Sequence, residues 1–106
     1  MINRVYSMMG LCMKAGKLAY GSDMCEERIK NNQAKLLVVA EDASDNTKRK
    51  FENLCSSNGI DFVFFGTIDL ISHNIGKNNK AIVAVLDEGF ATRIKEMLKE
   101  IKGANI

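Results

Sequence analysis

The sequence contains neither proline nor tryptophan, and only three of its residues are cysteines. Without proline-rich or other low-complexity segments there is no candidate linker, so residues 1–106 fit one domain with one core. No apolar run approaches the roughly 18 residues that a transmembrane helix needs, and the first residues lack a signal-peptide pattern. We therefore expect a cytoplasmic protein with no membrane partner.

Histidine and cysteine are too sparse for most catalytic or metal-binding arrangements. Cys12, Cys25 and Cys55 lie far apart, and each sits in a helix-like apolar pattern, which indicates buried thiols rather than disulfides. His73 is the single histidine and has no cysteine at zinc-ligand spacing. A thiol enzyme would need a cysteine to meet His73 in space, and nothing in the sequence indicates such a pair. We expect no catalytic residue, no metal site and no cofactor.

Positive charge is in small excess, since the formal net charge is +2. This value is too small to indicate a nucleic-acid partner by itself, but the charge is distributed unevenly. Residues 1–20 contain Arg4, Lys14 and Lys17 and no acidic residue. Any electrostatic binding surface must therefore be a local basic patch.

Hydrophobic periodicity predicts alternating helices and strands. Helical spacing covers residues 2–15, 24–30, 45–58, 67–75 and 90–102, and strand-like apolar runs cover residues 17–20, 36–40, 60–65 and 81–86. We predict an α/β fold, a three-layer α/β/α sandwich with a mixed sheet of about four strands. Parallel pairs should dominate where a helix intervenes between strands, with the first strand antiparallel or at an edge. Asp42 and Ser44 should cap the third helix, and Gly103 should end the last one.

Residues 21–44 contain the clearest candidate binding feature, a turn and helix start followed by a buried strand. Ser22 and Asp23 are good N-cap residues for this helix. A helix start after a glycine turn exposes unpaired N–H groups and the positive end of the helix dipole, which suits an anion. We expect Lys14 and Lys17 to lie close to it. The alternative is that the segment is only a capped turn.

Short sequence motifs follow one another in a characteristic order along nearly the whole chain. They are Gly21-Ser22-Asp23, Gln33-Ala34-Lys35-Leu36, Val38-Val39-Ala40-Glu41-Asp42-Ala43-Ser44, Asn46-Thr47, Lys50, Ile71-Ser72-His73-Asn74-Ile75-Gly76-Lys77, Val83-Ala84-Val85 and Gly89-Phe90-Ala91. Together they resemble the L7Ae family of ribosomal-type proteins, and most of all its bacterial YlxQ-type subgroup of short stand-alone proteins. Ser72 stands at a position where that family usually has glycine.

The resemblance implies an α/β/α sandwich that binds kink-turn RNA. In the family, the turn and helix start read Gly-x-Asn-Glu-x-x-Lys, and the Asn, Glu and Lys reach the tandem sheared G·A pairs of the RNA. The matching positions here are Gly21, Asp23, Met24 and Glu27. Asp23 keeps a hydrogen-bond acceptor, whereas Met24 lacks a carboxylate and Glu27 reverses the charge of the lysine. The family's second RNA-facing loop corresponds to residues 77–80, whose basic character favours phosphate contacts.

Two hypotheses for the function follow. In the first, the chain is a non-catalytic, monomeric RNA-binding protein of ribosomal-protein type, which docks a kink-turn or similarly bent RNA such as ribosomal RNA or an mRNA leader, with the ribosome as a further partner. The predicted contact residues are Lys14, Lys17, Gly21, Ser22, Asp23, Met24, Glu27, Lys77, Asn78, Asn79 and Lys80. In the alternative, the altered face binds a ribosomal or translation-associated protein, which the apolar Met24 in the recognition turn favours.

Overall fold

Helices and strands alternate along residues 2–102, which are the residues that this computed structural model describes. In chain order the elements are α1 (Ile2–Lys14), β1 (Leu18–Tyr20), α2 (Ser22–Lys30), β2 (Leu36–Val39), α3 (Asp45–Asn58), β3 (Phe62–Phe64), α4 (Ile68–Asn74), β4 (Ile82–Val85) and α5 (Glu88–Lys102). The predicted alternation is confirmed, although β3 and β4 are shorter than the apolar runs that predicted them. The predicted helix end at Gly103 lies outside the described residues.

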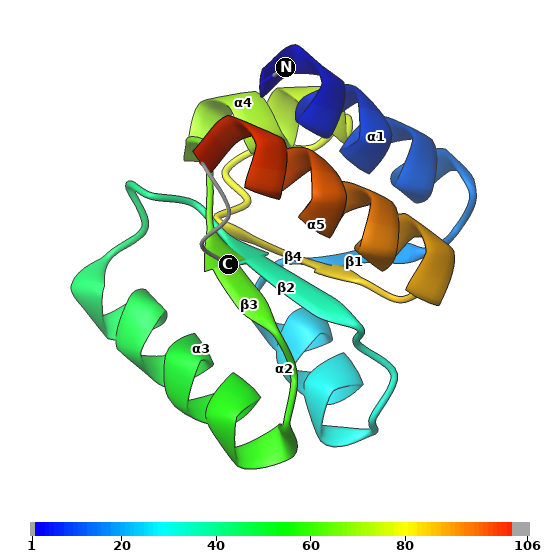
Figure 1. Cartoon of the computed structure of the whole chain (residues 1–106). Helices are drawn as coiled ribbons and strands as arrows, with labels where there is room; N and C mark the ends of the chain where they lie inside the picture. Colours follow the sequence, from blue (N-terminus) through cyan, green and yellow to red (C-terminus); the bar gives the residue numbers. More distant parts are fainter. Residues whose placement is uncertain (1, 103–106) are drawn as a thin grey trace.

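The elements form three layers, as predicted. Figure 1 shows α1, α4 and α5 on one face of the sheet and α2 and α3 on the other, and the helix contacts agree, since α1 packs on α4 and α5 while α2 packs on α3. All four residues of β2 and of β4 are buried. Their continuous apolar runs follow from this position, because both faces of each strand are covered by helices.

The sheet has the strand order β1-β4-β2-β3, with β1 and β3 at its edges. β2 pairs with β3 in parallel, whereas β4 is antiparallel to both β1 and β2. The prediction that β1 lies antiparallel or at an edge is confirmed. The prediction that parallel pairs dominate where a helix intervenes holds for β2 and β3, which α3 connects, but not for the two pairs that β4 makes. The helical crossover does make β1 and β2 point in the same direction, yet β4 lies between them in the reverse direction.

Two polar residues after β2 cap two different helices. Ser44 is the N-cap of α3, and its hydroxyl oxygen accepts a hydrogen bond from the Thr47 N–H at 3.2 Å. Asp42 was expected to cap the same helix, but its carboxylate accepts the N–H of Ile68, the first residue of α4, at 2.9 Å. Asp42 therefore ties the end of β2 to α4, which lies in the opposite helical layer from α3, and does not close a local turn.

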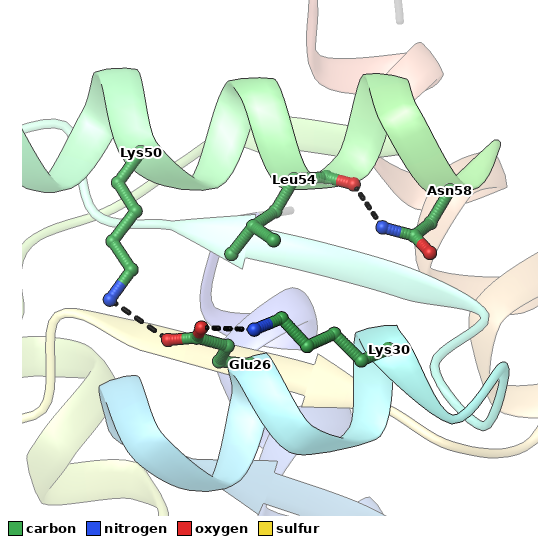
Figure 2. A network of polar contacts seen from close by, with 5 residues as sticks. All are labelled: Glu26, Lys30, Lys50, Leu54 and Asn58. Atoms are coloured by element: carbon green, nitrogen blue, oxygen red, sulfur yellow. Dashed lines mark hydrogen bonds and ion pairs between the residues drawn. The ribbon is translucent and has the colours of Figure 1, made fainter.

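Glu26 links α2 and α3, the two helices that cover one face of the sheet (Figure 2). Its carboxylate lies 2.8 Å from the ammonium of Lys30 on α2 and 2.9 Å from that of Lys50 on α3. The hydrogen bonds from Lys30 and then Lys50 lower the pKa of Glu26 from 4.5 to about 2. The network fixes α2, the helix that carries the candidate binding turn, against α3.

Glu26→Gln is expected to reduce stability in a pH-dependent manner. Because the folded-state pKa of Glu26 is depressed, its contribution is full above pH of about 4.5 and is lost as the pH falls through about 2. The difference in unfolding free energy between wild type and variant should therefore be small at neutral pH, since the two lysines that pair with Glu26 are exposed to solvent, and should vanish near pH 2. Urea denaturation at pH 7, 4 and 2 measures it. Glu52→Gln is the control, and an undiminished difference at pH 2 contradicts the assignment.

Candidate nucleic-acid interface

The candidate site begins at Gly21, which is the N-cap of α2 and has a φ of 84°. Glycine adopts this left-handed backbone without a steric penalty, and the Gly21 N–H donates to the Ile82 carbonyl at 3.0 Å. No side chain caps the helix, so the prediction that Ser22 or Asp23 is the N-cap is wrong. Both residues already lie inside the first turn, one and two positions beyond the capping residue.

An uncapped helix start leaves backbone donors available. The first hydrogen bond of α2 runs from the Cys25 N–H to the Gly21 carbonyl at 3.1 Å. The N–H groups of Ser22, Asp23 and Met24 precede this bond and have no acceptor within the helix. The positive end of the helix dipole lies at the same place, so the start of α2 can receive an anion.

Two lysines gather beside this helix start. A Cβ atom placed on Gly21 would lie 3.7 Å from the Nζ of Lys80, so the lysine side chain passes close over the turn. The Nζ of Lys77 lies 4.9 Å from the ring centroid of Tyr20, and that of Lys80 lies 5.6 Å from the same centroid. Both ammonium groups therefore lie around one aromatic ring, which attracts cations through its quadrupole. We call Lys77 and Lys80 the lysine pair.

The remaining predicted contact residues of this region are accessible. Ser22, Asp23, Glu27, Asn78 and Asn79 are exposed, and Met24 is 39% exposed. An open groove of about 480 Å³ lies beside the 77–80 loop and is lined by residues from α4 and from the loop itself. We call the first turns of α2 (residues 21–27) and the 77–80 loop together the recognition face.

Lys14 and Lys17 do not belong to the recognition face, and their expected proximity to Gly21 is wrong. Gly21 bonds to Ile82, the first residue of β4, whereas the Lys17 carbonyl accepts the N–H of Leu86, directly after the last residue of β4, at 2.8 Å. Lys17 and Gly21 therefore lie beside opposite ends of β4. At about 3.3 Å per residue, β1 carries the chain roughly 13 Å from Lys17 to Gly21. Lys14 ends α1 on the Lys17 side of the strand. Adjacency in sequence misled the prediction because a strand, rather than a turn, separates the two groups.

The structure adds two residues that the sequence reading missed. Tyr20 lies at the end of β1, directly before Gly21, and provides the ring that both lysines contact. Ser72 is buried in α4, and its hydroxyl oxygen accepts the Lys80 N–H at 2.7 Å. An aromatic residue directly before a turn glycine was the available signal for Tyr20. The only sequence feature that could have drawn attention to Ser72 was that the family usually has glycine at this position.

The described residues offer little evidence for a catalytic thiol or for a metal site. Burial is the main cause that raises the pKa of the Cys25 thiol to about 12 and those of Cys12 and Cys55 to about 11. These buried thiols are therefore protonated at neutral pH and are poor nucleophiles. Residues 2–102 contain no cluster of three or more His, Cys, Asp or Glu side chains that could hold a metal ion. In the same range, no helix combines the length and apolar character that crossing a membrane requires.

The fold and site define a small α/β/α sandwich with an anion-receptive helix start beside a basic loop. The chain belongs to the ribosomal protein L7Ae/L30e/S12e/Gadd45 family, whose family model matches residues 3–95. The family predicted from the sequence motifs is thereby confirmed.

Two curated relatives are similar over most of the chain. The RNA-binding protein YlxQ of Bacillus subtilis (strain 168) is 32% identical over 93 residues, which cover 88% of this chain and 93% of that protein. The RNA-binding protein YlxQ of Enterococcus faecium is 36% identical over 97 residues, which cover 91% of this chain and 92% of that protein. The resemblance to the YlxQ-type subgroup is thus confirmed.

Two solved structures share the fold. A protein of unknown function from Bacillus halodurans has a TM-score of 0.86 and 26% identity, covering 90% of this chain and 96% of that one. The 15.5 kD RNA-binding protein of Giardia lamblia has a TM-score of 0.77 and 12% identity, covering 96% of this chain and 88% of that one. At 12% identity the second likeness concerns the fold alone.

Proposed function

We propose that this protein binds structured RNA, specifically a kink-turn or similarly bent RNA, on its recognition face. The observation that carries the proposal is the lysine pair, whose two ammonium groups lie around Tyr20 next to the open start of α2. None of the ion pairs identified within residues 2–102 involves either lysine. Two like charges placed beside one ring without an ion-pair partner favour an external anion, and RNA phosphates supply one.

The contacts divide into positioning and base readout. The lysine pair and the N–H groups of Ser22, Asp23 and Met24 suit phosphate oxygens, which fix the register of the RNA. The exposed carboxylate of Asp23 suits a base edge, because it accepts hydrogen bonds from a guanine N–H. Asn78 and Asn79 offer further donors and acceptors from the loop. The resulting activity is binding rather than catalysis.

The relatives support this proposal and its setting. Both YlxQ proteins that match most of the chain are named RNA-binding proteins. We further propose ribosomal RNA or an mRNA leader as the ligand, the ribosome as the larger partner and the cytoplasm as the location, and membership of a family that includes ribosomal proteins supports this proposal. We propose that the protein acts there as a monomer.

Replacing the lysine pair by glutamine (Lys77→Gln with Lys80→Gln) should reduce the salt dependence of RNA binding. Each lost phosphate contact releases about one fewer counterion, so the slope of log K against log[salt] should flatten by about two units. Affinity should fall for every RNA tested. Binding measured by fluorescence anisotropy over a salt series gives the slope.

The matched control for the lysine pair is Lys14→Gln with Lys17→Gln, which removes the same charge from the other end of β1. This control should leave the slope nearly unchanged, because Lys14 and Lys17 lie away from the recognition face. Equal flattening by both double variants would mean that RNA contacts no particular face. A wild-type slope in the Lys77/Lys80 variant would remove the basic loop from the site.

Asp23→Ala should reduce the discrimination between a kink-turn RNA and a plain duplex of the same length. The substitution removes a base-edge acceptor and no positive charge, so discrimination should fall by about 1–3 kcal/mol while the salt slope stays nearly constant. Competition binding with both RNAs measures this effect. If the variant discriminates as well as the wild type does, Asp23 does not read bases.

A protein-interaction adaptor is the second candidate function, and the 39% exposure of Met24 favours it. An exposed apolar side chain in the middle of the recognition face suits a protein partner better than it suits phosphates. Sequencing of RNA crosslinked to the tagged protein in cells separates the candidates. Enrichment of bent structured RNA supports the RNA-binding proposal, and recovery of no RNA above background favours the adaptor.

A further inference from the structure

Ser72 is a buried polar residue of α4, with 4% of its surface exposed. Its hydroxyl oxygen accepts the N–H of Lys80 at 2.7 Å, and the same hydroxyl lies 3.3 Å from the Lys80 carbonyl, to which it donates. A buried hydroxyl is retained at low energetic penalty only when such partners satisfy it. Here both partners belong to a single residue eight positions further along the chain.

The backbone of Ser72 holds the other end of the same loop. Its carbonyl accepts the Lys77 N–H at 2.9 Å. Residues 77 and 80 are therefore both tied to Ser72, one through its main chain and one through its side chain. The chain bends directly before each of them, because Gly76 and Asn79 have left-handed φ values of 72° and 54°.

The two residues tied to Ser72 are the two members of the lysine pair. Because their backbones are fixed, their side chains leave the loop from defined points and reach the ring of Tyr20, one residue before Gly21. The arrangement holds two ammonium groups beside the same aromatic ring before any ligand arrives. Binding then avoids part of the entropy loss of ordering a flexible basic loop.

We infer that Ser72 is a positioning residue of the recognition face, which pre-orders the lysine pair for phosphate contact through its bonds to the 77–80 loop. This inference rests on the proposed RNA-binding function. Ser72 does not itself contact RNA and acts only through Lys77 and Lys80. Its removal should therefore weaken binding without altering base discrimination.

The first test measures the order of the loop in the absence of RNA. Ser72→Ala keeps the helix and removes the hydroxyl, so the Lys80 amide should exchange with solvent roughly fivefold faster or more. Amide hydrogen exchange followed by NMR measures this rate, and residues of β2 report that the variant is folded. Ser57→Ala, at an exposed serine of α3, is the matched control and should change nothing in the loop. Unchanged exchange at Lys80 in Ser72→Ala would overturn the inference.

The second test is a double-mutant cycle on binding of a kink-turn RNA. Ser72→Ala should weaken binding roughly three- to tenfold in the wild-type background, and by nearly nothing when Lys77 and Lys80 are already glutamine. A purely structural role would weaken binding equally in both backgrounds, and that result would overturn the inference. If the wild type binds kink-turn RNA no better than a plain duplex, the proposed kink-turn specificity fails instead, and the exchange measurement still decides the role of Ser72.

Discussion

Gly66→Ala is expected to lower the free energy of unfolding by about 2–4 kcal/mol. Gly66 connects β3 to α4 with a φ of 74°, where an alanine is strained. A Cβ atom at this position would also overlap the hydroxyl oxygen of Tyr6. Tyr6 is 4% exposed and packs on Phe65 with ring centroids 5.2 Å apart, so it has little room to move. Urea denaturation measures the loss.

The control for Gly66→Ala is Gly59→Ala, which separates backbone strain from the clash with Tyr6. Gly59 has a similar φ of 68°, but a Cβ there would meet nothing within 4 Å. Its replacement should lose only about 1–2 kcal/mol. Tyr6→Phe removes the overlapping oxygen and should recover part of the loss of Gly66→Ala. Equal losses for both glycine variants would show that the contact with Tyr6 is unimportant.

Glu27→Lys is expected to tighten binding of a kink-turn RNA by about 1 kcal/mol or more, roughly fivefold. Glu27 is exposed on α2, about one turn beyond the helix start that is proposed to face phosphate. A carboxylate there repels the ligand, and a lysine attracts it. Gel-shift titration at fixed low salt compares the two proteins.

Glu96→Lys is the matched control for Glu27→Lys, because it makes the same change of charge on an exposed residue of α5, in the opposite helical layer. This control should alter affinity much less, since exposed charges beyond about 10 Å are screened at 0.1 M salt. Equal tightening by both variants would point to a general charge effect. An unchanged affinity for Glu27→Lys would mean that RNA does not reach this part of α2.

The layers of the fold were predictable because burial imposes local patterns. β2 and β4 are covered on both faces, and this requirement produces the apolar runs that identified them. The end of α3 was predictable for a similar reason, since Gly59 adopts the left-handed backbone that ends many helices. In each case the requirement, burial or a left-handed backbone, applies to neighbouring residues in the chain, so the sequence alone reveals it.

Several of the errors concern contacts between distant segments. The hydrophobic pattern of the sequence does not indicate that β4 lies between β1 and β2, because a buried strand is continuously apolar whichever strands it pairs with. Asp42 is a suitable cap for any helix, and only the fold brings the start of α4 to it. The contacts of Tyr20 with the lysine pair also join segments that are far apart in the chain. Lys80 of the basic loop lies beside Gly21, whereas Lys14 and Lys17 lie toward the other end of β1. The contact of these residues with RNA stays a prediction.

The position of β4 also constrains when this protein can fold during translation. β4 is an inner strand of the sheet, yet among residues 2–102 it is the last strand to be synthesised, and it pairs Leu18 with Val85 across most of this range. The nascent polypeptide can pair β2 with β3 early, but β1 and β2 have no shared neighbour until β4 emerges. Two apolar strand edges thus stay open through most of synthesis, and such edges are the sites at which chaperones or other nascent chains attach.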